Sequence, residues 1–338
     1  MMPRVVYPEI LDSDTALEAD ILTPHAQVSF NDVPLIADLD PALCRDADGL
    51  LVFRHHVTRA DFDRFPKLSV LVRIGVGYDR IDMATAAERG ILVCNVPDYG
   101  TTEIADHAMG LILSLRRGLL LHHDLQRGTS PAPWLLVETP LIDRLNVQTL
   151  GIIGLGRIGT ALAMRAKAFG LRVVFYDPYV PNGVDLALGI ERARALPDLL
   201  RVANVLSLNC LLSDETRGMI GAAELAQLPR GAIIVNTARG AVMDIEALEA
   251  AMRAGHVAGA GLDVIPVEPP VEPLPGLLRA YRECEDWLTG RLIVTPHVAY
   301  YSAPANRDIR VKAAETMVAA LQGRPQNVVL PAPRHGRG

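Results

Sequence analysis

The sequence lacks the patterns of disulfide-stabilised, zinc-binding and membrane-spanning proteins. Its four cysteines are far apart, and no pair has the CxxC or CxxH spacing of a zinc site. No uninterrupted apolar run approaches the ~18 residues of a transmembrane helix, and no apolar stretch follows the first residues. We therefore expect a cytoplasmic protein without a metal site or a disulfide framework, with reduced thiols at Cys44, Cys94, Cys210 and Cys284.

A dense run of lysine or arginine is also missing, and the formal net charge is −6. Proteins that bind nucleic acids or membrane surfaces present concentrated basic residues, so we expect neither partner. Of the 338 residues, 50% are hydrophobic and 21% are charged. This composition is typical of a globular enzyme with a small-molecule substrate, and the chain is long enough for two domains.

The most informative motif is a three-glycine turn that follows an apolar strand at 150–153 and opens a helix at 158–169. Gly154 allows a tight turn, Gly156 lets a pyrophosphate approach the backbone, and Gly159 lets the helix pack closely on the strand. The N–H groups at the helix N-terminus then bind the pyrophosphate. Glycine turns also occur for purely structural reasons, but this context favours dinucleotide binding.

Asp177 ends the next strand, 18 residues after Gly159. A carboxylate at this point of the motif accepts hydrogen bonds from ribose hydroxyls and repels a 2′-phosphate. The motif therefore favours NAD over NADP as cofactor, and the strictness of that preference stays open.

Strand-like and helix-like segments alternate along the chain, which is typical of parallel sheets with helices on both faces. We predict the α/β class, with two doubly wound parallel-sheet domains, a flavodoxin-like substrate domain and a Rossmann NAD domain, flanking a cleft. The predicted strands are Arg4 to Tyr7, Leu50 to Arg54, Ser69 to Ile74 and Ile91 to Asn95 in the first sheet, and Leu150 to Ile153, Val173 to Tyr176, Val205 to Asn209, Ala232 to Asn236, Gly261 to Val264 and Leu292 to Thr295 in the second.

Two further helical patterns suggest how the domains connect. One long pattern, Thr102 to Arg127, lies between the sheets, and another, Ala303 to Gln322, follows the last strand. Because the second sheet is already complete, we expect the last helix to return to the first domain. The substrate domain is then 1–101 with 299–338, the NAD domain is 102–298, and two crossings allow a hinge motion. The last residues, 333–338, suggest a loose tail.

A second glycine turn, at Gly75 and Gly77, also follows a strand and opens a helix. Arg80 occupies the position of the third glycine, and so large a side chain would hold helix and strand apart. We therefore expect a poor pyrophosphate site here. The backbone N–H groups around Val76 are better suited to a smaller anion such as a carboxylate.

Three charged residues follow core strands of the predicted NAD domain, where ligands of open α/β sheets bind. They are Arg239, Glu268 and His297. Each has an ordinary alternative: a surface ion pair for the arginine, a solvated turn for the glutamate and a surface position for the histidine. As a set they match one reaction, because a glutamate fixes the tautomer of a histidine and stabilises its protonated form.

In that reaction, hydride moves between the nicotinamide and a carbon while His297 passes a proton to or from the oxygen on that carbon. Arg239 stabilises the developing alkoxide charge and holds the adjacent carboxylate with its planar guanidinium. The substrate class that fits is a 2-hydroxy acid and its 2-keto acid.

The chain resembles the D-isomer-specific 2-hydroxyacid dehydrogenases, and the branch of the C-terminal-binding proteins looks most similar. The resemblance covers about Val70 to Gln322. It is densest in the segments RIGVGYD (73–79), CNVP (94–97), GIIGLGRIG (151–159), RAKAFG (165–170), FYDPY (175–179), VNTARG (235–240) and TPH (295–297).

The resemblance implies a homodimer, to which the helix after Asn95-Val-Pro97 and the following loop contribute. It also implies that Arg239, Glu268 and His297 are catalytic. The implied cofactor contacts are Val76, Gly154, Leu155, Gly156, Arg157, Ile158, Gly159, Asp177, Cys210, Leu211, Leu212, Thr216, Thr237, Ala238, Arg239, Asp263, His297, Ala299 and Tyr300. The candidate substrate contacts are Arg54, Val76, Gly77, Arg239, His297 and Tyr300, with Phe53, Tyr78, Tyr99 and Trp134 as further side chains near the pocket.

The chain departs from the C-terminal-binding proteins in the longer interval between Glu268 and His297, and in Tyr300 where those proteins carry a tryptophan. The N-terminal seventy residues match weakly. The leading hypothesis is an NAD-dependent 2-hydroxyacid dehydrogenase of either physiological direction. The alternatives are an NADH-sensing scaffold that recruits a partner, and a phosphite-type dehydrogenase. A formate dehydrogenase is disfavoured, because those enzymes carry a glutamine at the position of Glu268.

Overall fold

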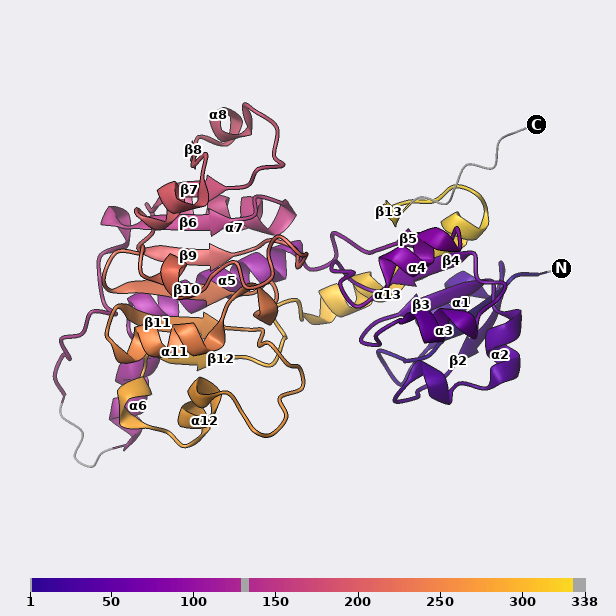
Figure 1. Cartoon of the computed structure of the whole chain (residues 1–338), viewed down its shortest axis with the longest axis horizontal. Coiled ribbons are helices and arrows are strands. Elements are labelled where there is room, and N and C mark those ends of the chain that lie inside the picture. Colours follow the sequence, from indigo (N-terminus) through magenta and orange to yellow (C-terminus); the bar gives the residue numbers. More distant parts are fainter. Residues whose placement is uncertain (1, 129–133, 331–338) are drawn as a thin grey trace. The chain divides into compact units, whose positions relative to one another are not determined.

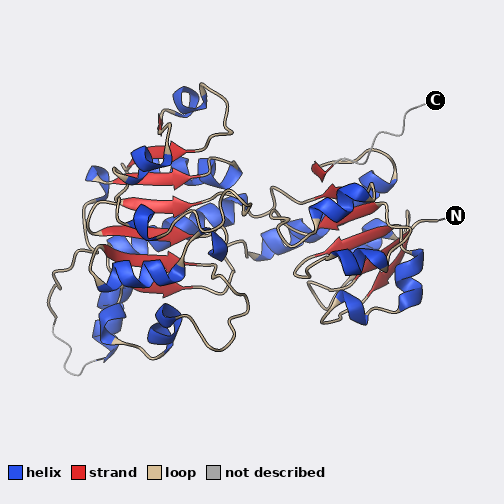
Figure 2. Ribbon diagram, viewed as in Figure 1, coloured by secondary structure: helices blue, strands red, loops and turns tan. Residues whose placement is uncertain are grey.

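The computed structural model describes residues 2–128 and 134–330, and it divides into two compact units (Figure 1). Unit 1 comprises Met1–Gly100 and Ser302–Gly338, and unit 2 comprises Thr101–Tyr301. The tail predicted at 333–338 lies outside the described residues. Each unit is a sheet with helices on both faces (Figure 2).

The described part of unit 1 contains a six-stranded sheet in the order β13-β5-β4-β3-β1-β2. Strands β1 to β5 are parallel, and β13 pairs antiparallel with β5. The strands are β1 Arg4–Tyr7, β2 Gln27–Phe30, β3 Gly49–Val52, β4 Val70–Arg73, β5 Leu92–Cys94 and β13 Val328–Leu330. The helices are α1 Ala16–Leu22, α2 Pro41–Asp46, α3 Arg59–Asp63, α4 Met83–Glu88 and α13 Ala303–Leu321.

Helix α13 returns from the end of unit 2 and packs against α1, β3 and β4. Arg310 on α13 is buried, and its Nε donates to Oε1 of the buried Glu18 on α1 at 2.6 Å. Arg310 Nη1 also lies 3.2 Å from Asp12 Oδ2. A buried arginine needs such partners, because an unpaired charge away from water is costly. These contacts hold the C-terminal helix on unit 1.

The described part of unit 2 contains a seven-stranded parallel sheet in the order β12-β11-β10-β9-β6-β7-β8. The strands are β6 Thr149–Ile153, β7 Arg172–Tyr176, β8 Glu191–Arg192, β9 Val205–Leu208, β10 Ala232–Asn236, β11 Val257–Leu262 and β12 Leu292–Val294. The helices are α5 Thr101–Arg116, α6 Leu119–Gly128, α7 Arg157–Ala168, α8 Val184–Leu188, α9 Leu196–Leu200, α10 Ala222–Leu225, α11 Ile245–Arg253 and α12 Gly276–Arg282.

The central strands of unit 2 are apolar along their whole length because both of their faces are buried. In β10, Ile233 and Val235 join the core under α5 and α7, whereas Ile234 joins the core under α9 to α12. From β6 the sheet continues through β7 and β8 on one side and through β9 to β12 on the other. The order of the strands therefore reverses between β6 and β9, which makes this a topological switch point. Ligands of open α/β sheets bind at the carboxyl ends of the strands at such a point.

The predicted α/β class with two parallel-sheet domains is confirmed, and the predicted elements need two corrections. The single helix predicted at 102–127 is two helices, because the chain turns at Gly118, whose φ is +60°. Strands β2, β8 and β13 were not predicted. They are edge strands and are partly exposed, so they lack the apolar run that marks an internal strand.

Candidate active site

The three-glycine turn joins β6 to α7 with the backbone geometry that the motif requires. Gly154 has φ +89°, and a Cβ on it would lie 2.7 Å from the Cys210 nitrogen. A Cβ on Gly159 would lie 2.2 Å from the Gly154 oxygen, so only glycine lets α7 approach the turn this closely. By contrast, a Cβ on Gly156 would meet no atom of the described residues within 4 Å. The turn is therefore a cradle that stays open because Gly156 has no side chain.

Asp177 lies at the end of β7, beside the glycine turn. Its Oδ2 accepts from the Leu155 N–H at 2.9 Å, and its Oδ1 accepts from the Tyr179 N–H at 2.9 Å. These bonds fix the carboxylate at the edge of the turn, where it suits ribose hydroxyls. The Tyr179 hydroxyl donates to Glu215, which ties the segment after β7 to the segment after β9.

The segment after β9 carries Cys210 and continues to Thr216. Thr216 Oγ1 donates to the Leu211 carbonyl at 2.6 Å and accepts from the Ser213 N–H at 2.8 Å, which closes a compact turn. Burial raises the pKa of Cys210 to about 11, and the nearby Asp177 acts in the same direction. Cys210 is therefore a neutral, apolar side chain at the carboxyl end of β9.

The residues after β10 include Thr237, Ala238 and Arg239. Thr237 Oγ1 is buried and has no hydrogen-bond partner among the described residues. Buried hydroxyls are normally paired, so this one fits a polar ligand atom. With the open cradle at Gly156 and the carboxylate of Asp177, the residues present fit a dinucleotide.

Arg239, Glu268 and His297 follow β10, β11 and β12, which are consecutive neighbours in the sheet. Gly240 joins two of these loops: a Cβ on it would lie 1.9 Å from the carbonyl carbon of Ile265. The loop that carries the arginine therefore packs backbone to backbone on the loop that carries the glutamate. Arg239 Nη1 donates to the Ala238 carbonyl at 2.8 Å, and the Asn236 side chain donates to the Arg239 carbonyl at 3.0 Å.

Glu268 and His297 form the pair that the sequence predicts. His297 Nδ1 donates to Glu268 Oε2 at 2.6 Å, and the other oxygen, Oε1, accepts from the Ile265 N–H at 3.1 Å. The side chain of His297 is 35% exposed and that of Glu268 is 21% exposed. Because Nδ1 carries the hydrogen toward the carboxylate, Nε2 is the nitrogen available for proton transfer.

His297 has φ +53°, in the left-handed region that non-glycine residues rarely adopt. Such strain persists only where the surrounding contacts hold it, and it is often found at functional sites. Tyr300 lies beside this turn, with its ring edge-on to the imidazole at 6.4 Å between centroids.

Asp263, an expected cofactor contact, is buried under the same turn. Its Oδ1 accepts from the Thr295 hydroxyl at 2.6 Å and from the Val298 N–H at 2.9 Å. Its Oδ2 accepts from the Ala299 N–H at 3.0 Å. In this structure the carboxylate therefore binds the chain around His297.

In unit 1, Arg54 follows β3 and is tied to a buried carboxylate that the sequence did not reveal. Glu9 accepts from Arg54 Nε, and its Oε2 accepts from the Arg54 N–H at 2.8 Å. His55 Nδ1 lies 3.1 Å from Glu9 Oε2, and His55 Nε2 donates to the Val33 carbonyl at 2.9 Å. Burial acts to raise the pKa of Glu9, but the hydrogen bonds from His55 and Arg54 outweigh it and lower that pKa to about 2.

The second glycine turn, after β4, is shaped by an arginine. Gly75 has φ +134°, and a Cβ on it would lie 1.3 Å from Arg73 Nη1. The Val76 carbonyl accepts from Asn95 Nδ2 at 2.7 Å, and Arg80 Nη1 donates to the Arg54 carbonyl at 2.7 Å. The guanidinium of Arg73 therefore lies against Gly75, and Arg80, at the position of the third glycine, reaches the segment after β3.

The remaining substrate candidates differ in their surroundings. Phe53 lies near the guanidinium groups of Arg54 and Arg73, at 5.5 Å and 5.7 Å from its ring centroid. Tyr78 packs on the core of unit 1, and Tyr99 is buried. Trp134 is 88% exposed.

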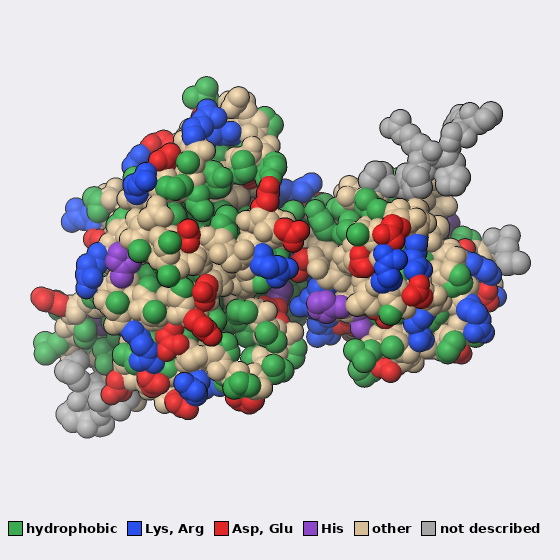
Figure 3. All heavy atoms as spheres, viewed as in Figure 1, with side chains coloured by type: hydrophobic (Ala, Val, Ile, Leu, Met, Phe, Trp, Pro, Cys, Tyr) green, Lys and Arg blue, Asp and Glu red, His purple; other side chains and the backbone are tan. Residues whose placement is uncertain are grey.

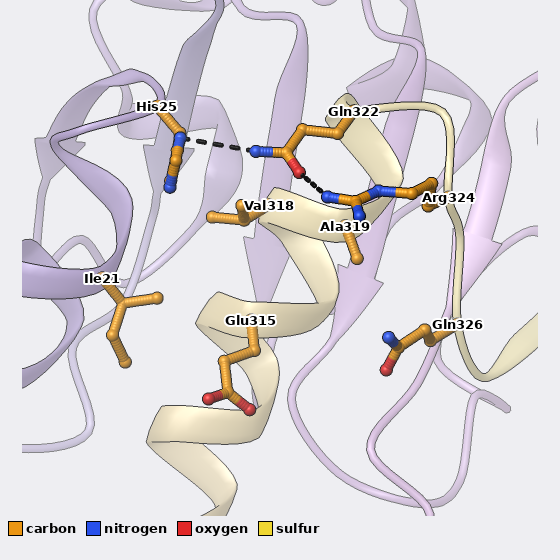
Figure 4. A pocket seen from close by; sticks show the side chains of 8 residues that line it. All are labelled: Ile21, His25, Glu315, Val318, Ala319, Gln322, Arg324 and Gln326. Carbon is orange, nitrogen blue, oxygen red and sulfur yellow. Dashed lines mark hydrogen bonds between the residues drawn. The ribbon is translucent and has the colours of Figure 1, made fainter.

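A pocket of about 350 Å³ in unit 1 lies apart from all of these candidates. It is formed by α1, α13 and the segment after α13 (Figure 4). His25, Gln322 and Arg324 form its polar rim, and Glu315 lies farther toward the N-terminal end of α13. The sequence did not single out any of these side chains.

Two features are absent from the described residues. No group of three or more His, Cys, Asp or Glu side chains is placed to hold a metal ion, and no helix is long and apolar enough to cross a bilayer. On the face shown in Figure 3, acidic and basic side chains are interspersed over both units.

Comparisons with known proteins agree on one family. More than half of the chain, residues 109–299, matches the family model of the D-isomer specific 2-hydroxyacid dehydrogenase, NAD binding domain. The chain is 35% identical over 320 residues to C-terminal-binding protein 1 of Caenorhabditis elegans. The aligned region covers 93% of this chain and 43% of that protein. It spans about half the length of the curated relatives it matches.

Solved structures of the same fold cover nearly the whole chain. The D-lactate dehydrogenase from Aquifex aeolicus, complexed with NAD and lactic acid, is 28% identical with a TM-score of 0.82, over 95% of this chain and 96% of that one. The NADPH-dependent glyoxylate/hydroxypyruvate reductase from Sinorhizobium meliloti, in complex with NADP and malonate, is 29% identical with a TM-score of 0.84, over 98% of each chain.

Proposed function

We propose that this chain, which belongs to the D-isomer specific 2-hydroxyacid dehydrogenase family, is an NAD-dependent oxidoreductase that interconverts a D-2-hydroxy acid and its 2-keto acid. The observation that carries the proposal is the 2.6 Å hydrogen bond between His297 and Glu268. Arg239 follows the strand next to that of Glu268, so the site combines a proton donor with an anion-binding group.

His297 is the proposed general acid and base. Its Nδ1–H is held by Glu268, so Nε2 gives a proton to the keto oxygen in reduction and takes one from the hydroxyl in oxidation. Glu268 accepts the Nδ1–H, so it fixes the tautomer of the imidazole and faces the positive charge of its protonated form. When bound, the nicotinamide supplies or accepts the hydride.

Arg239 is the proposed group that binds the substrate carboxylate and polarises the adjacent carbonyl. A planar guanidinium can make two parallel hydrogen bonds to a carboxylate, which fixes the orientation of the reacting carbon. The bond from Nη1 to the Ala238 carbonyl limits the rotation of this side chain before substrate arrives.

The residues of unit 2 that would hold NAD follow the carboxyl ends of β6, β7, β9, β10 and β12, and in unit 1 we propose Val76 as a cofactor-binding residue. We propose the glycine turn for the pyrophosphate and Asp177 for the adenosine ribose, with the segment Cys210 to Thr216 and the segment Thr237 to Arg239 completing the site. The carboxylate of Asp177 favours NAD over NADP.

Two alanine substitutions test this cofactor site. Gly156→Ala adds a methyl group to the open cradle, so NADH affinity should fall by about tenfold or more while the thermal midpoint is unchanged. Gly110→Ala on α5 is the matched control, because a Cβ there also meets no atom within 4 Å. Fluorescence titration with NADH measures both. Equal NADH affinities in the two variants would mean that the glycine turn does not bind the cofactor.

In unit 2 we propose Arg239, His297 and Tyr300 as substrate-binding residues, and in unit 1 we propose Arg54, Val76 and Gly77. Arg54 is held by the buried Glu9 and favours a substrate with a second anionic group. Measuring kcat/KM over 2-keto acids of graded size and charge tests this. Arg54→Gln should lower the preference for dicarboxylic substrates, and Arg59→Gln, an exposed arginine paired with Glu88, is the control.

The same panel tests the activity itself. The wild-type protein should oxidise NADH with at least one 2-keto acid, and phosphite with NAD is assayed beside it. If the protein binds NADH but turns over no keto acid, the proposed reaction is wrong. Reduction of NAD with phosphite would then support a phosphite dehydrogenase instead.

We propose a homodimer for the assembly. The loop after α6 exposes the consecutive apolar side chains Trp134, Leu135 and Leu136 to water. An apolar patch of this kind usually marks an interface, and a second copy is the occupant we propose. Leu136→Asp should shift the sedimentation coefficient to that of a monomer, whereas Leu186→Asp, at an equally exposed leucine on α8, should not.

A second candidate function is an NADH-sensing scaffold, favoured by the 35% identity to C-terminal-binding protein 1. A pull-down with NADH, with NAD and without nucleotide separates the two functions. A partner recovered only with NADH, from protein that turns over no keto acid, would support the scaffold.

A further inference from the structure

We infer that His107, Thr295 and Asp263 form a hydrogen-bonded chain that positions His297, which makes all three positioning residues of the proposed reaction. His107 lies on α5, Thr295 follows β12, and Asp263 follows β11. All three belong to unit 2. The inference rests on the proposed function for its kinetic consequences, but the arrangement itself is independent of it.

The direction of each hydrogen bond follows from the chemistry of the groups. The carboxylate of Asp263 can only accept, so the Thr295 hydroxyl donates to Oδ1 at 2.6 Å. The Thr295 oxygen is then the acceptor for His107 Nε2 at 3.0 Å. His107 therefore carries its hydrogen on Nε2, and the same atom lies 3.8 Å from Asp263 Oδ1.

Asp263 passes this restraint to the turn that carries the catalytic imidazole. Its side chain accepts from the N–H groups of Val298 and Ala299, and its backbone carbonyl accepts from the His297 N–H at 2.8 Å. Three consecutive N–H groups of the turn are thus bound to one residue. Because His297 has φ +53°, the turn needs such a restraint to stay in its left-handed conformation.

The buried carboxylate of Asp263 is itself stabilised by these hydrogen bonds. Asp263 is only 2% exposed, so its charge depends on donors within the protein. Among the described donors to Asp263, Thr295 supplies the side-chain hydroxyl. His107 on α5 donates to the oxygen of that hydroxyl and so fixes its rotamer. Loss of the Thr295 hydroxyl leaves Oδ1 with a backbone donor alone and loosens the turn around His297.

The test uses the full-length protein and two readouts. Thr295→Val removes the hydroxyl and Thr295→Ser keeps it, while His107→Ala and His107→Gln remove and partly replace the imidazole donor. Thr289→Val, at an exposed threonine of unit 2, is the control. The kinetic readout is kcat and the KM for NADH, and the structural readout is the imidazole ¹⁵N spectrum of His297, assigned with His297→Asn.

We expect Thr295→Val and His107→Ala to lower kcat by about tenfold with little change in the KM for NADH, and to move the His297 Nδ1 resonance. Thr295→Ser and His107→Gln should recover most of both. An unchanged His297 resonance in Thr295→Val would overturn the inference. If wild type turns over no keto acid but the resonance moves as expected, the positioning chain stands and the proposed reaction fails.

Discussion

The described residues contain two glutamate–histidine pairs, one in each unit, and the pairs differ in their surroundings. In unit 2, His297 is 35% exposed and Glu268 21% exposed, and Nδ1 is the one imidazole nitrogen with a partner among the described residues. In unit 1, His55 is 8% exposed and Glu9 7% exposed, and both ring nitrogens of His55 face acceptors. The same two residue types therefore leave one imidazole nitrogen available in unit 2 and none in unit 1.

The difference shows what a histidine–carboxylate pair needs for proton transfer. A histidine that faces a carboxylate and a carbonyl is held as a charged donor and has no nitrogen left for substrate. A histidine with one nitrogen bound and the other directed outward can gain and lose a proton. We therefore expect substitutions in unit 2 to change the rate and substitutions in unit 1 to change stability.

The largest expected effect is on the rate. His297→Asn and Glu268→Gln should each lower kcat/KM by about 10² to 10⁴-fold, because the proton donor is lost or no longer held. Both side chains are partly exposed, so the urea midpoint should stay within error. Steady-state assays and urea titrations of the variants measure this, with the exposed His25→Gln and Glu246→Gln as controls. Wild-type rates in both variants would contradict the assignment.

The next effect is on stability. Glu9→Gln leaves the buried His55 and the Arg54 backbone N–H without their charged acceptor, so the free energy of unfolding should fall by about 3 kcal/mol. Urea unfolding followed by circular dichroism measures it. Glu88→Gln, at an exposed ion pair with Arg59, should cost less than about 1 kcal/mol. Equal losses of unfolding free energy in the two variants would mean that the buried contacts of Glu9 do not stabilise unit 1.

A smaller effect is expected at acidic pH. The pKa of Glu9 falls from 4.5 to about 2 in the folded protein, so its ionised form stabilises the fold above pH 4.5. That stabilisation is lost as the pH falls from 4.5 through about 2. Thermal midpoints across this range should drop more steeply for wild type than for Glu9→Gln. Parallel curves would contradict the prediction.

The smallest effect is expected as the pH rises above 6.5. The hydrogen bond to Glu9 raises the pKa of His55 above 6.5, although burial acts against it. A raised pKa means that protonated His55 stabilises the fold below pH 6.5, and that this contribution disappears as the pH rises through the folded value. Thermal midpoints from pH 6 upward should therefore decline slightly more in wild type than in His55→Gln.

Much of the fold was predictable because its signals are local. Strands such as Ala232 to Asn236 are apolar runs bounded by turn residues, and the structure places β10 at the same residues. Edge strands escaped prediction because half of their side chains meet water, and the break at Gly118 escaped because the apolar periodicity continues across it.

The candidate site was predictable in part, for the same reason. Arg239, Glu268 and His297 each follow a recognisable strand, and the predicted pairing of Glu268 with His297 is present as a 2.6 Å bond. Their catalytic roles stay predictions. His107 and Thr295 are 188 residues apart in sequence, and Glu9 and Arg54 are 45 apart, so no local pattern relates them.

By itself, the sequence determined the class of fold, the glycine turn and the residue types at the strand ends, because apolar periodicity and glycine conformation act over short distances along the chain. Only the tertiary structure decided which carboxylate meets which histidine, and how much water each pair sees. Those two quantities depend on loops that converge from different strands. They distinguish His297, whose Nε2 is left for proton transfer, from His55, whose Nδ1 faces the Glu9 carboxylate and whose Nε2 donates to the Val33 carbonyl.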